Sequence, residues 1–174
     1  AREAAKPLRY ALAEVERAAQ TFLVAAEESK RINGEVIRLD WTPTGQGKEG
    51  IIKKFPLGLI AGISPFNFPL NLAVHKIAPA IASGNPIILK PASSTPLSTL
   101  ALARIIHQTD LPQGAVCILP SSRTAGNQLV TDERIKLLSF TGSDTVGWEM
   151  KKQCGKKKTV LELGGNAGVI ISSS

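Results

Sequence analysis

The first thirty residues place apolar and charged side chains with the spacing of a helix. Glutamate, arginine and lysine side chains lie between the apolar ones, as in an amphipathic helix. Further along, residues 35–41 and 51–55 are strand-like and enclose a polar turn, which predicts a β-hairpin that projects from the main fold. The apolar helix positions are Leu8, Leu12, Val15, Ala19, Phe22 and Ala26.

From residue 57 onward, short apolar runs alternate with helical segments. The runs are rich in Ile, Val and Leu, as in parallel strands that are covered on both faces. The sequence therefore predicts an α/β fold, with a doubly wound, Rossmann-like, mainly parallel sheet and helices on both faces. We expect an N-terminal helix in residues 1–34, the hairpin in 35–55 and the α/β core in 56–174. Within the core, strands are expected at 57–63, 86–90, 115–119, 135–140, 159–163 and 167–171, and helices at 69–82, 95–107, 124–130 and 144–154.

Residues 45–50, Gly-Gln-Gly-Lys-Glu-Gly, match the G-x-G-x-x-G pattern of dinucleotide-binding loops. That pattern binds a pyrophosphate where it follows a strand and begins a helix, because the N–H groups of the helix then face the phosphates. Here the glycines stand between two strand-like segments, and Ile51 and Ile52 follow them. We interpret the segment as a hairpin turn, so any cofactor site must lie elsewhere.

The formal net charge is +7, and lysines gather at Lys151, Lys152 and residues 156–158. No nucleic-acid-binding motif accompanies them, so we expect a solvated helix end and no nucleic-acid partner. No apolar run approaches the roughly 18 residues that span a bilayer, and Cys117 and Cys154 lack metal-ligand spacing. These features predict a cytoplasmic protein without membrane association, disulfide framework or metal site.

Polar side chains follow the predicted strands at their carboxyl ends, where parallel α/β sheets bind ligands. Asn67 could donate an N–H to a developing oxyanion, or it could cap the next helix. Ser143 and the N–H groups of the helix that follows it could bind a phosphate, or the serine could be an ordinary helix cap. Lys90 could hydrogen-bond a ribose or a phosphate, or it could simply be solvated.

Glu162 stands between two leucines at the end of another predicted strand. A carboxylate in an apolar setting is a candidate general base, although it could instead turn outward or pair with a lysine. Gly164 and Gly165 follow it and favour the close approach of a ligand.

Three stretches together resemble the aldehyde dehydrogenase family: PFNFPLNLAVHKIAPAIASGNPIILKPASSTPL, LSFTGSDTVG and VLELGGN. The resemblance implies that Asn67 is the oxyanion-hole amide and Glu162 the general base in the oxidation of an aldehyde to a carboxylate. It also implies an NAD or NADP site in the core, and a homo-oligomeric parent protein whose subunits the hairpin bridges. The implied cofactor-site residues are Ile63, Ser64, Pro65, Phe66, Lys90, Ser93, Gly126, Phe140, Thr141, Gly142, Ser143, Val146, Leu163 and Gly164.

Three departures from the family pattern qualify this expectation. Ser93 replaces a glutamate that often grips the ribose hydroxyls of NAD, so the 2′-phosphate of NADP would meet no negative charge there. Residues 120–122, Pro-Ser-Ser, replace a glycine-rich loop. The family's catalytic cysteine comes after the glutamate motif, beyond Ser174, and the positions of Cys117 and Cys154 do not suit a nucleophile. We therefore predict that this chain alone is inactive, with a non-catalytic nucleotide-binding or interaction module as the alternative.

Overall fold

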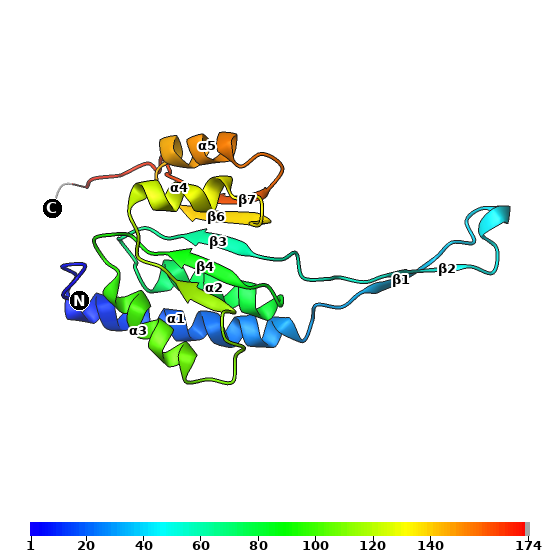
Figure 1. The fold of residues 1–174 in the computed structure, drawn as a ribbon, viewed down its shortest axis with the longest axis horizontal. Coiled ribbons are helices and arrows are strands. Elements are labelled where there is room, and N and C mark those ends of the chain that lie inside the picture. Colours follow the sequence, from blue (N-terminus) through cyan, green and yellow to red (C-terminus); the bar gives the residue numbers. More distant parts are fainter. Residues whose placement is uncertain (173–174) are drawn as a thin grey trace.

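The computed structural model describes residues 1–172 and has a five-stranded sheet at its centre (Figure 1). The sheet order is β5-β4-β3-β6-β7, and all neighbouring strands are parallel. The chain builds outward from β3 to β5 and then crosses back to β6, on the other side of β3. Such a reversal leaves a crevice at the carboxyl ends of the strands. The strands are β3 (Ile60–Ile63), β4 (Ile87–Lys90), β5 (Val116–Ile118), β6 (Leu137–Thr141) and β7 (Lys158–Glu162).

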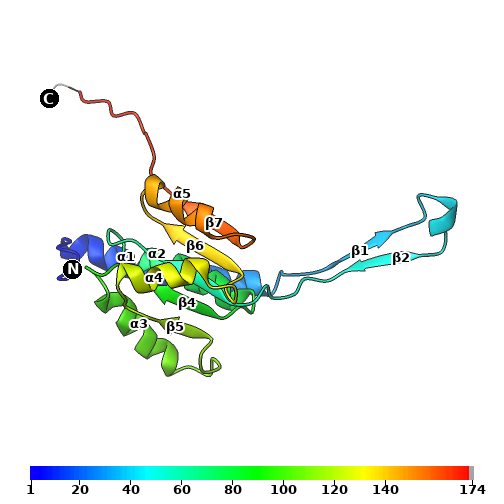
Figure 2. The ribbon, with the colours of Figure 1, turned by 45° about the horizontal axis from the view of Figure 1, so that its top comes forward.

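Helices cover both faces of the sheet (Figure 2). One face carries α2 (Asn71–Ala82) and α3 (Leu97–His107), and the other carries α4 (Arg123–Thr131) and α5 (Asp144–Gln153). Because both faces are buried at the centre of the sheet, β3 and the first three residues of β4 are apolar at consecutive positions. The predicted doubly wound α/β fold is confirmed. The buried side chains are Ala73, Ile77 and Leu89 on the first face, and Ala61, Val130, Leu138 and Phe140 on the second.

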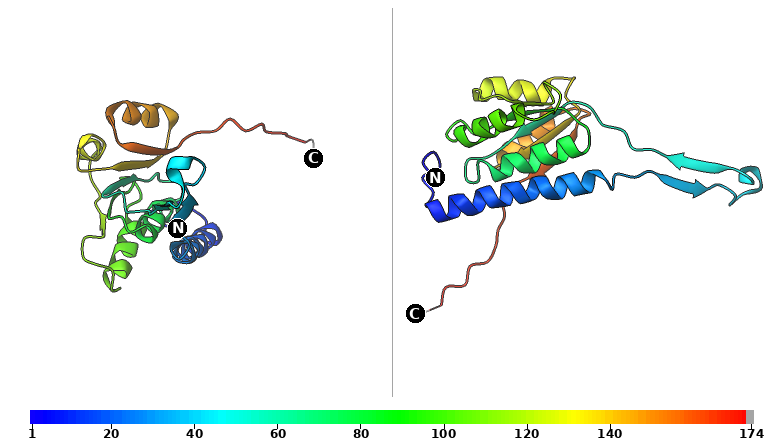
Figure 3. Two further views of the ribbon diagram at one scale, coloured as in Figure 1. Left: turned by 90° about the vertical axis from the view of Figure 1, so that its right-hand side faces the viewer. Right: turned by 90° about the horizontal axis from the view of Figure 1, so that it is seen from below.

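The N-terminal helix α1 (Leu8–Ser29) lies outside α2 rather than on the sheet (Figure 3). Its contact face is centred on Ala18, which packs against Val74 and Ala78 of α2. Small alanines allow two helices to approach closely, and the buried residues of α1 are Ala18 and Glu14, neither of which belongs to the predicted apolar face. Of the predicted apolar face, only Phe22 packs in this cluster. Leu8, Leu12 and Val15 are more than half exposed.

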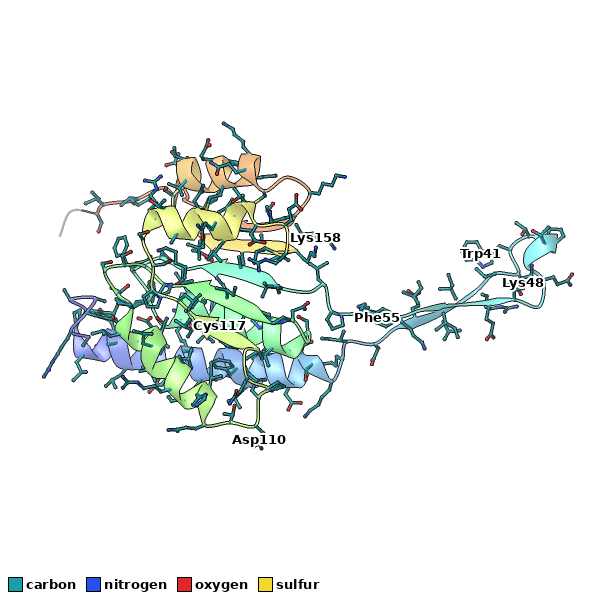
Figure 4. The ribbon with its side chains drawn as sticks, in the orientation of Figure 1. Trp41, Lys48, Phe55, Asp110, Cys117 and Lys158 are labelled. Atoms are coloured by element: carbon teal, nitrogen blue, oxygen red, sulfur yellow. The ribbon has the colours of Figure 1, made fainter. Side chains whose placement is uncertain are left out.

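The hairpin projects from the body of the protein, as expected. It consists of β1 (Glu35–Arg38) and β2 (Glu49–Ile52), which are antiparallel and shorter than predicted. A short 3₁₀ helix, η1 (Pro43–Gly45), lies in the connection. Figure 4 shows Trp41 and Lys48 at the far end of the hairpin. The glycine-rich motif lies in this connection and in β2, and no helix follows it, so it is not a phosphate-binding loop.

The last predicted strand, at residues 167–171, does not form. After β7 the chain runs away from the body in an extended path (Figures 2 and 3), and Ile170 and Ile171 are at least 90% exposed. A strand needs a neighbour to pair with its backbone groups, and no described strand lies beside this segment.

None of the described helices is long and apolar enough to cross a membrane.

Two serines at helix N-termini provide a matched stability test. The Ser122 hydroxyl accepts a hydrogen bond from the Ala125 N–H at 3.2 Å and caps α4, whereas Ser143 makes no such bond at α5. We expect Ser122→Ala to lower the free energy of unfolding by about 1 kcal/mol and Ser143→Ala to leave it nearly unchanged. Urea unfolding of both variants checks this. Equal losses would contradict the assignment.

Candidate active site

The parallel sheet brings the carboxyl ends of four strands to one edge. In register, Ile63 lies beside both Lys90 and Phe140, and Thr141 lies beside Glu162. This edge is at the arrowheads in Figure 1 and faces away from the hairpin. The last residues of these strands and those just after them therefore surround one region, although they are as much as 100 positions apart in the sequence (residues 64–67, 90–93, 141–143 and 162–164).

A hydrogen-bonded chain links the Glu162 carboxylate to a lysine that the sequence analysis did not single out. Lys76 of α2 is only 7% exposed. Its Nζ donates to Thr141 Oγ1 at 2.8 Å and to Ser139 Oγ at 3.2 Å, and Thr141 Oγ1 donates to Glu162 Oε2 at 3.1 Å. Burial lowers the pKa of Lys76 from 10.5 to about 8, and the charge of Glu162 opposes that shift. The arrangement can move or hold a proton near the Glu162 carboxylate.

Lys76 could have been suspected from the sequence. Apart from His75, it is the only polar side chain in the stretch Leu72–Ala82, and long cationic side chains are rarely buried without a polar partner. The partners, Ser139 and Thr141, come from β6, more than sixty residues away. Periodicity along one helix carries no information about such contacts, so the interaction emerges only in the tertiary structure.

Glu162 is exposed, which corrects the expectation of apolar surroundings. Successive side chains of a strand point to opposite faces. Leu161 and Leu163 pack in the core cluster on the α4 and α5 side, so Glu162 points to the α2 side, where Thr141 reaches it. The exposure agrees with the alternative that Glu162 turns outward. The lysine alternative does not hold as a direct ion pair, because Glu162 contacts Lys76 through the Thr141 hydroxyl.

Asn67 lies on the exposed loop between β3 and α2. Its Oδ1 accepts the Phe68 N–H at 3.1 Å, and its Nδ2 makes no hydrogen bond within residues 1–172. The structure does not support the alternative role as a cap, because the first N–H groups of α2 bond to Glu14 instead. The carboxamide is thus held by its oxygen, with its donor free for a ligand. Before it in this loop, Ser64 is buried and Phe66 is exposed.

Lys90 ends β4 in a setting that fits an anionic or hydroxylated ligand. It is 9% exposed, burial lowers its pKa, and its Nζ has only one weak acceptor among the described residues, the Pro91 carbonyl at 3.4 Å. Its stem lies against Gly126 in the first turns of α4, where an added Cβ would be 2.7 Å from Lys90 Cδ. Ser93 is exposed on the same strand-end loop. A buried cation with so little compensation is a suitable partner for a ribose or phosphate.

The loop after β6 has little space for side chains. A Cβ at Gly142 would lie 2.5 Å from the Phe140 ring, and one at Gly147 would lie 2.3 Å from Leu163. Ser143 is exposed at the start of α5, with its hydroxyl not used for capping. Val146 and Leu163 pack around Phe140 in the core, while Gly164 is exposed. The backbone at this corner can therefore approach a ligand, with Ser143 as its free hydroxyl.

Both cysteines lie away from the carboxyl edge. Cys117 is half-buried in the middle of the edge strand β5 (Figure 4), less enclosed than its apolar neighbours in the sequence suggested. Cys154 follows the C-terminus of α5 and is buried, which raises the pKa of its thiol. A raised pKa disfavours the nucleophilic thiolate. Within residues 1–172 no group of three or more His, Cys, Asp or Glu side chains could hold a metal ion.

Comparisons with known proteins agree with this architecture. The model of the aldehyde dehydrogenase family matches residues 1–174. The chain is 39% identical to 3-sulfolactaldehyde dehydrogenase of Priestia aryabhattai over 172 residues, which are 98% of this chain and 36% of that protein.

Two solved structures share both sequence and fold with the chain. Aldehyde dehydrogenase 21 of Physcomitrella patens, in complex with the reaction product succinate, is 57% identical with a TM-score of 0.92 over 95% of this chain and 34% of that one. Glyceraldehyde-3-phosphate dehydrogenase of Methanocaldococcus jannaschii, complexed with NADP, is 40% identical with a TM-score of 0.84 over 93% and 35%. The chain thus spans about a third of the relatives it matches, and it belongs to the aldehyde dehydrogenase family.

Proposed function

We propose that this chain is the cofactor-binding portion of an NAD(P)-dependent aldehyde dehydrogenase that oxidises an aldehyde to a carboxylate. The observation that carries the proposal is that the carboxyl ends of four parallel strands meet on one side of the sheet. This region brings together the Asn67 carboxamide, whose N–H donor is free, and the Glu162 carboxylate, which is linked through Thr141 to the buried Lys76. It also contains Lys90, a buried cation with one weak hydrogen-bond acceptor among the described residues. Family membership supports the reaction class.

Each residue has a distinct chemical task in this proposal. Asn67 Nδ2 donates to the oxygen of the aldehyde as negative charge develops on it. The Glu162 carboxylate accepts a proton from the water that hydrolyses the thioester, and Thr141 and Lys76 orient it. Lys90 and Ser143 hold the ribose and the pyrophosphate of the cofactor. Bound NAD(P) supplies the hydride acceptor.

The thiol of such a thioester is not supplied by this chain in our proposal. Cys154 is buried with a raised pKa, and Cys117 is in the middle of β5. We therefore expect no aldehyde-dependent reduction of NAD or NADP by the chain alone, measured by absorbance of the reduced cofactor. Turnover by the unsubstituted chain would overturn this expectation, and its loss in the Cys117→Ser, Cys154→Ser double variant would assign the thiol to one of these two cysteines. A binding module without catalysis would bind cofactor and likewise show no turnover.

We propose NADP as the preferred cofactor. Ser93 places no negative charge on the loop after Lys90, and Arg123 is in the first turn of α4, three residues before the Gly126 that touches Lys90. A cation one helical turn from Gly126 lies on the same face of the helix, so two positive side chains flank the region. The NADP complex of the M. jannaschii relative supports this choice.

Calorimetric titration of the chain with NADP and with NAD tests the binding proposal, and Ser93→Glu tests its basis. We expect the unsubstituted chain to bind NADP more tightly than NAD. The new carboxylate should weaken NADP binding about tenfold through like-charge repulsion while sparing NAD. Ser94→Glu, on the neighbouring exposed position, is the control. If neither cofactor binds at millimolar concentration, or if both variants lose NADP equally, the proposed site is wrong.

The assembly and location of the whole protein remain predictions. The hairpin exposes Val36, Trp41, Ile51 and Phe55, which supports the prediction that it bridges subunits of a homo-oligomer. The two cysteines are unpaired, in keeping with the cytoplasmic location expected from the sequence.

A further inference from the structure

We infer that three charged residues near the N-terminus form a clamp that positions the loops of the strand edge, above all the loop that carries Asn67. The residues are Glu3, Lys6 and Glu14, called the N-terminal clamp below. The contribution of the clamp to catalysis rests on the proposed function of Asn67. The clamp itself is defined by contacts across the fold.

Glu14 caps α2 from a distant part of the chain. It is on α1 and only 6% exposed. Its Oε1 accepts the Leu70 N–H at 2.9 Å and the Asn71 N–H at 3.2 Å, whereas α2 has no side-chain cap of its own. The first N–H groups of a helix need such acceptors, and a carboxylate there also interacts favourably with the helix dipole. Glu14 therefore fixes where α2 begins, four residues after Asn67.

Lys6 connects this cap to Asn67 itself. Its Nζ donates to Glu14 Oε2 at 2.5 Å and to the backbone carbonyl of Asn67 at 2.7 Å, and it lies 3.9 Å from the centre of the Phe68 ring. The Lys6 side chain is only 14% exposed. A hydrogen bond from a charged donor is stronger than one between neutral groups. The backbone of the exposed Asn67 is thus anchored through its carbonyl by a side chain 61 positions away.

Glu3 anchors the start of α3, which follows the loop after β4, in the same way. Its carboxylate accepts the Leu97 N–H at 2.6 Å and the Ser98 N–H at 2.9 Å, and it contacts the Ser98 hydroxyl. These are the first N–H groups of α3, which has no side-chain cap of its own. The Thr95 hydroxyl, just before α3, is buried without a partner in the described part of the chain. α3 follows the loop with Ser93, so Glu3 holds the cofactor side of the edge.

The clamp positions backbone groups of the Asn67 loop that make few other contacts among the described residues. Asn67 lies in a loop outside any helix or strand, and its side chain bonds only to its neighbour. A hydrogen-bond donor stabilises an oxyanion only when it is held close to its productive position before the reaction. Ala5 has a left-handed backbone, φ +46°, in the turn that presents Lys6. We assign Lys6 and Glu14 as positioning residues, not catalytic ones.

Local order at Asn67 tests the clamp without cofactor or substrate. In Lys6→Met and in Glu14→Gln we expect the N–H groups of Phe68, Leu70 and Asn71 to exchange with solvent about tenfold faster. We also expect a lower ¹⁵N heteronuclear NOE at the Asn67 side-chain amide. Exchange in β3 and β4 should remain unchanged. Lys6→Arg, which keeps the cation, should restore the order of the loop.

The ion pair between Lys30 and Glu27 provides the matched control on α1. It is 2.8 Å long and well exposed on both sides, so Lys30→Met should leave Asn67 unchanged. Two outcomes would overturn the clamp: an unchanged Asn67 amide in both clamp variants, or faster exchange throughout the sheet, which reports global destabilisation alone. Because the readout needs no ligand, a loosened loop in a chain that fails to bind NADP would refute the proposed function and leave the clamp standing.

Discussion

Replacing Lys90 by methionine should weaken NADP binding by about 10- to 100-fold, because a hydrogen bond to a charged group contributes about 1.5–3 kcal/mol. Lys90 is only 9% exposed, and the only acceptor that residues 1–172 offer its ammonium is the Pro91 carbonyl at 3.4 Å. A ribose hydroxyl or phosphate would compensate the desolvated charge, and methionine of similar length cannot. Calorimetric titration of the variant measures the loss.

Lys158→Met is the matched control for this prediction. Lys158 is exposed at the amino end of β7, at the opposite edge of the sheet (Figure 4). The control separates a local contact from a loss of overall positive charge, which would weaken the binding of any anion. Equal losses of NADP affinity in the two variants would show that long-range electrostatic attraction, and not a contact with Lys90 beside Gly126, binds the cofactor.

Lys76 should give the protein a distinctive pH dependence of stability. Its pKa is about 8 in the folded state against 10.5 ordinarily. Between these values the unfolded chain binds a proton at this site and the folded chain does not, so stability rises with pH across this window. The cost of the buried charge is complete below pH 8 and is lost as the pH rises to 10.5. It amounts to about 3 kcal/mol.

Urea unfolding of the unsubstituted chain and of Lys76→Met, at pH values from 7 to 10.5, isolates this effect. Relative to the variant, the unsubstituted chain should gain about 3 kcal/mol in the free energy of unfolding over the window. All other titrating groups cancel in the difference. Lys136→Met, at an exposed position, should show no such trend. A pH-independent difference for Lys76→Met would mean that the lysine is not desolvated as the structure indicates.

Much of the fold was predictable because local patterns reflect it directly. Apolar runs of strand length, separated by helical segments, specify a parallel sheet covered on both faces. The strand ends then follow, and with them the region where Asn67, Lys90, Ser143 and Glu162 gather. The strand predicted at 167–171 failed for the complementary reason. Its Val and Ile residues favour a strand, but strand formation also requires a neighbour.

The sequence by itself determined the fold class, the edge of the sheet where the polar residues lie, and the rejection of the hairpin glycines as a phosphate loop. Only the tertiary structure decided which face of α1 is buried, that Glu162 reaches Lys76 through Thr141, and that Glu3 and Glu14 cap helices far from them in sequence. The physical reason is range. Periodicity and turn chemistry are local, whereas a hydrogen bond across 56 or 95 positions depends on how the layers pack.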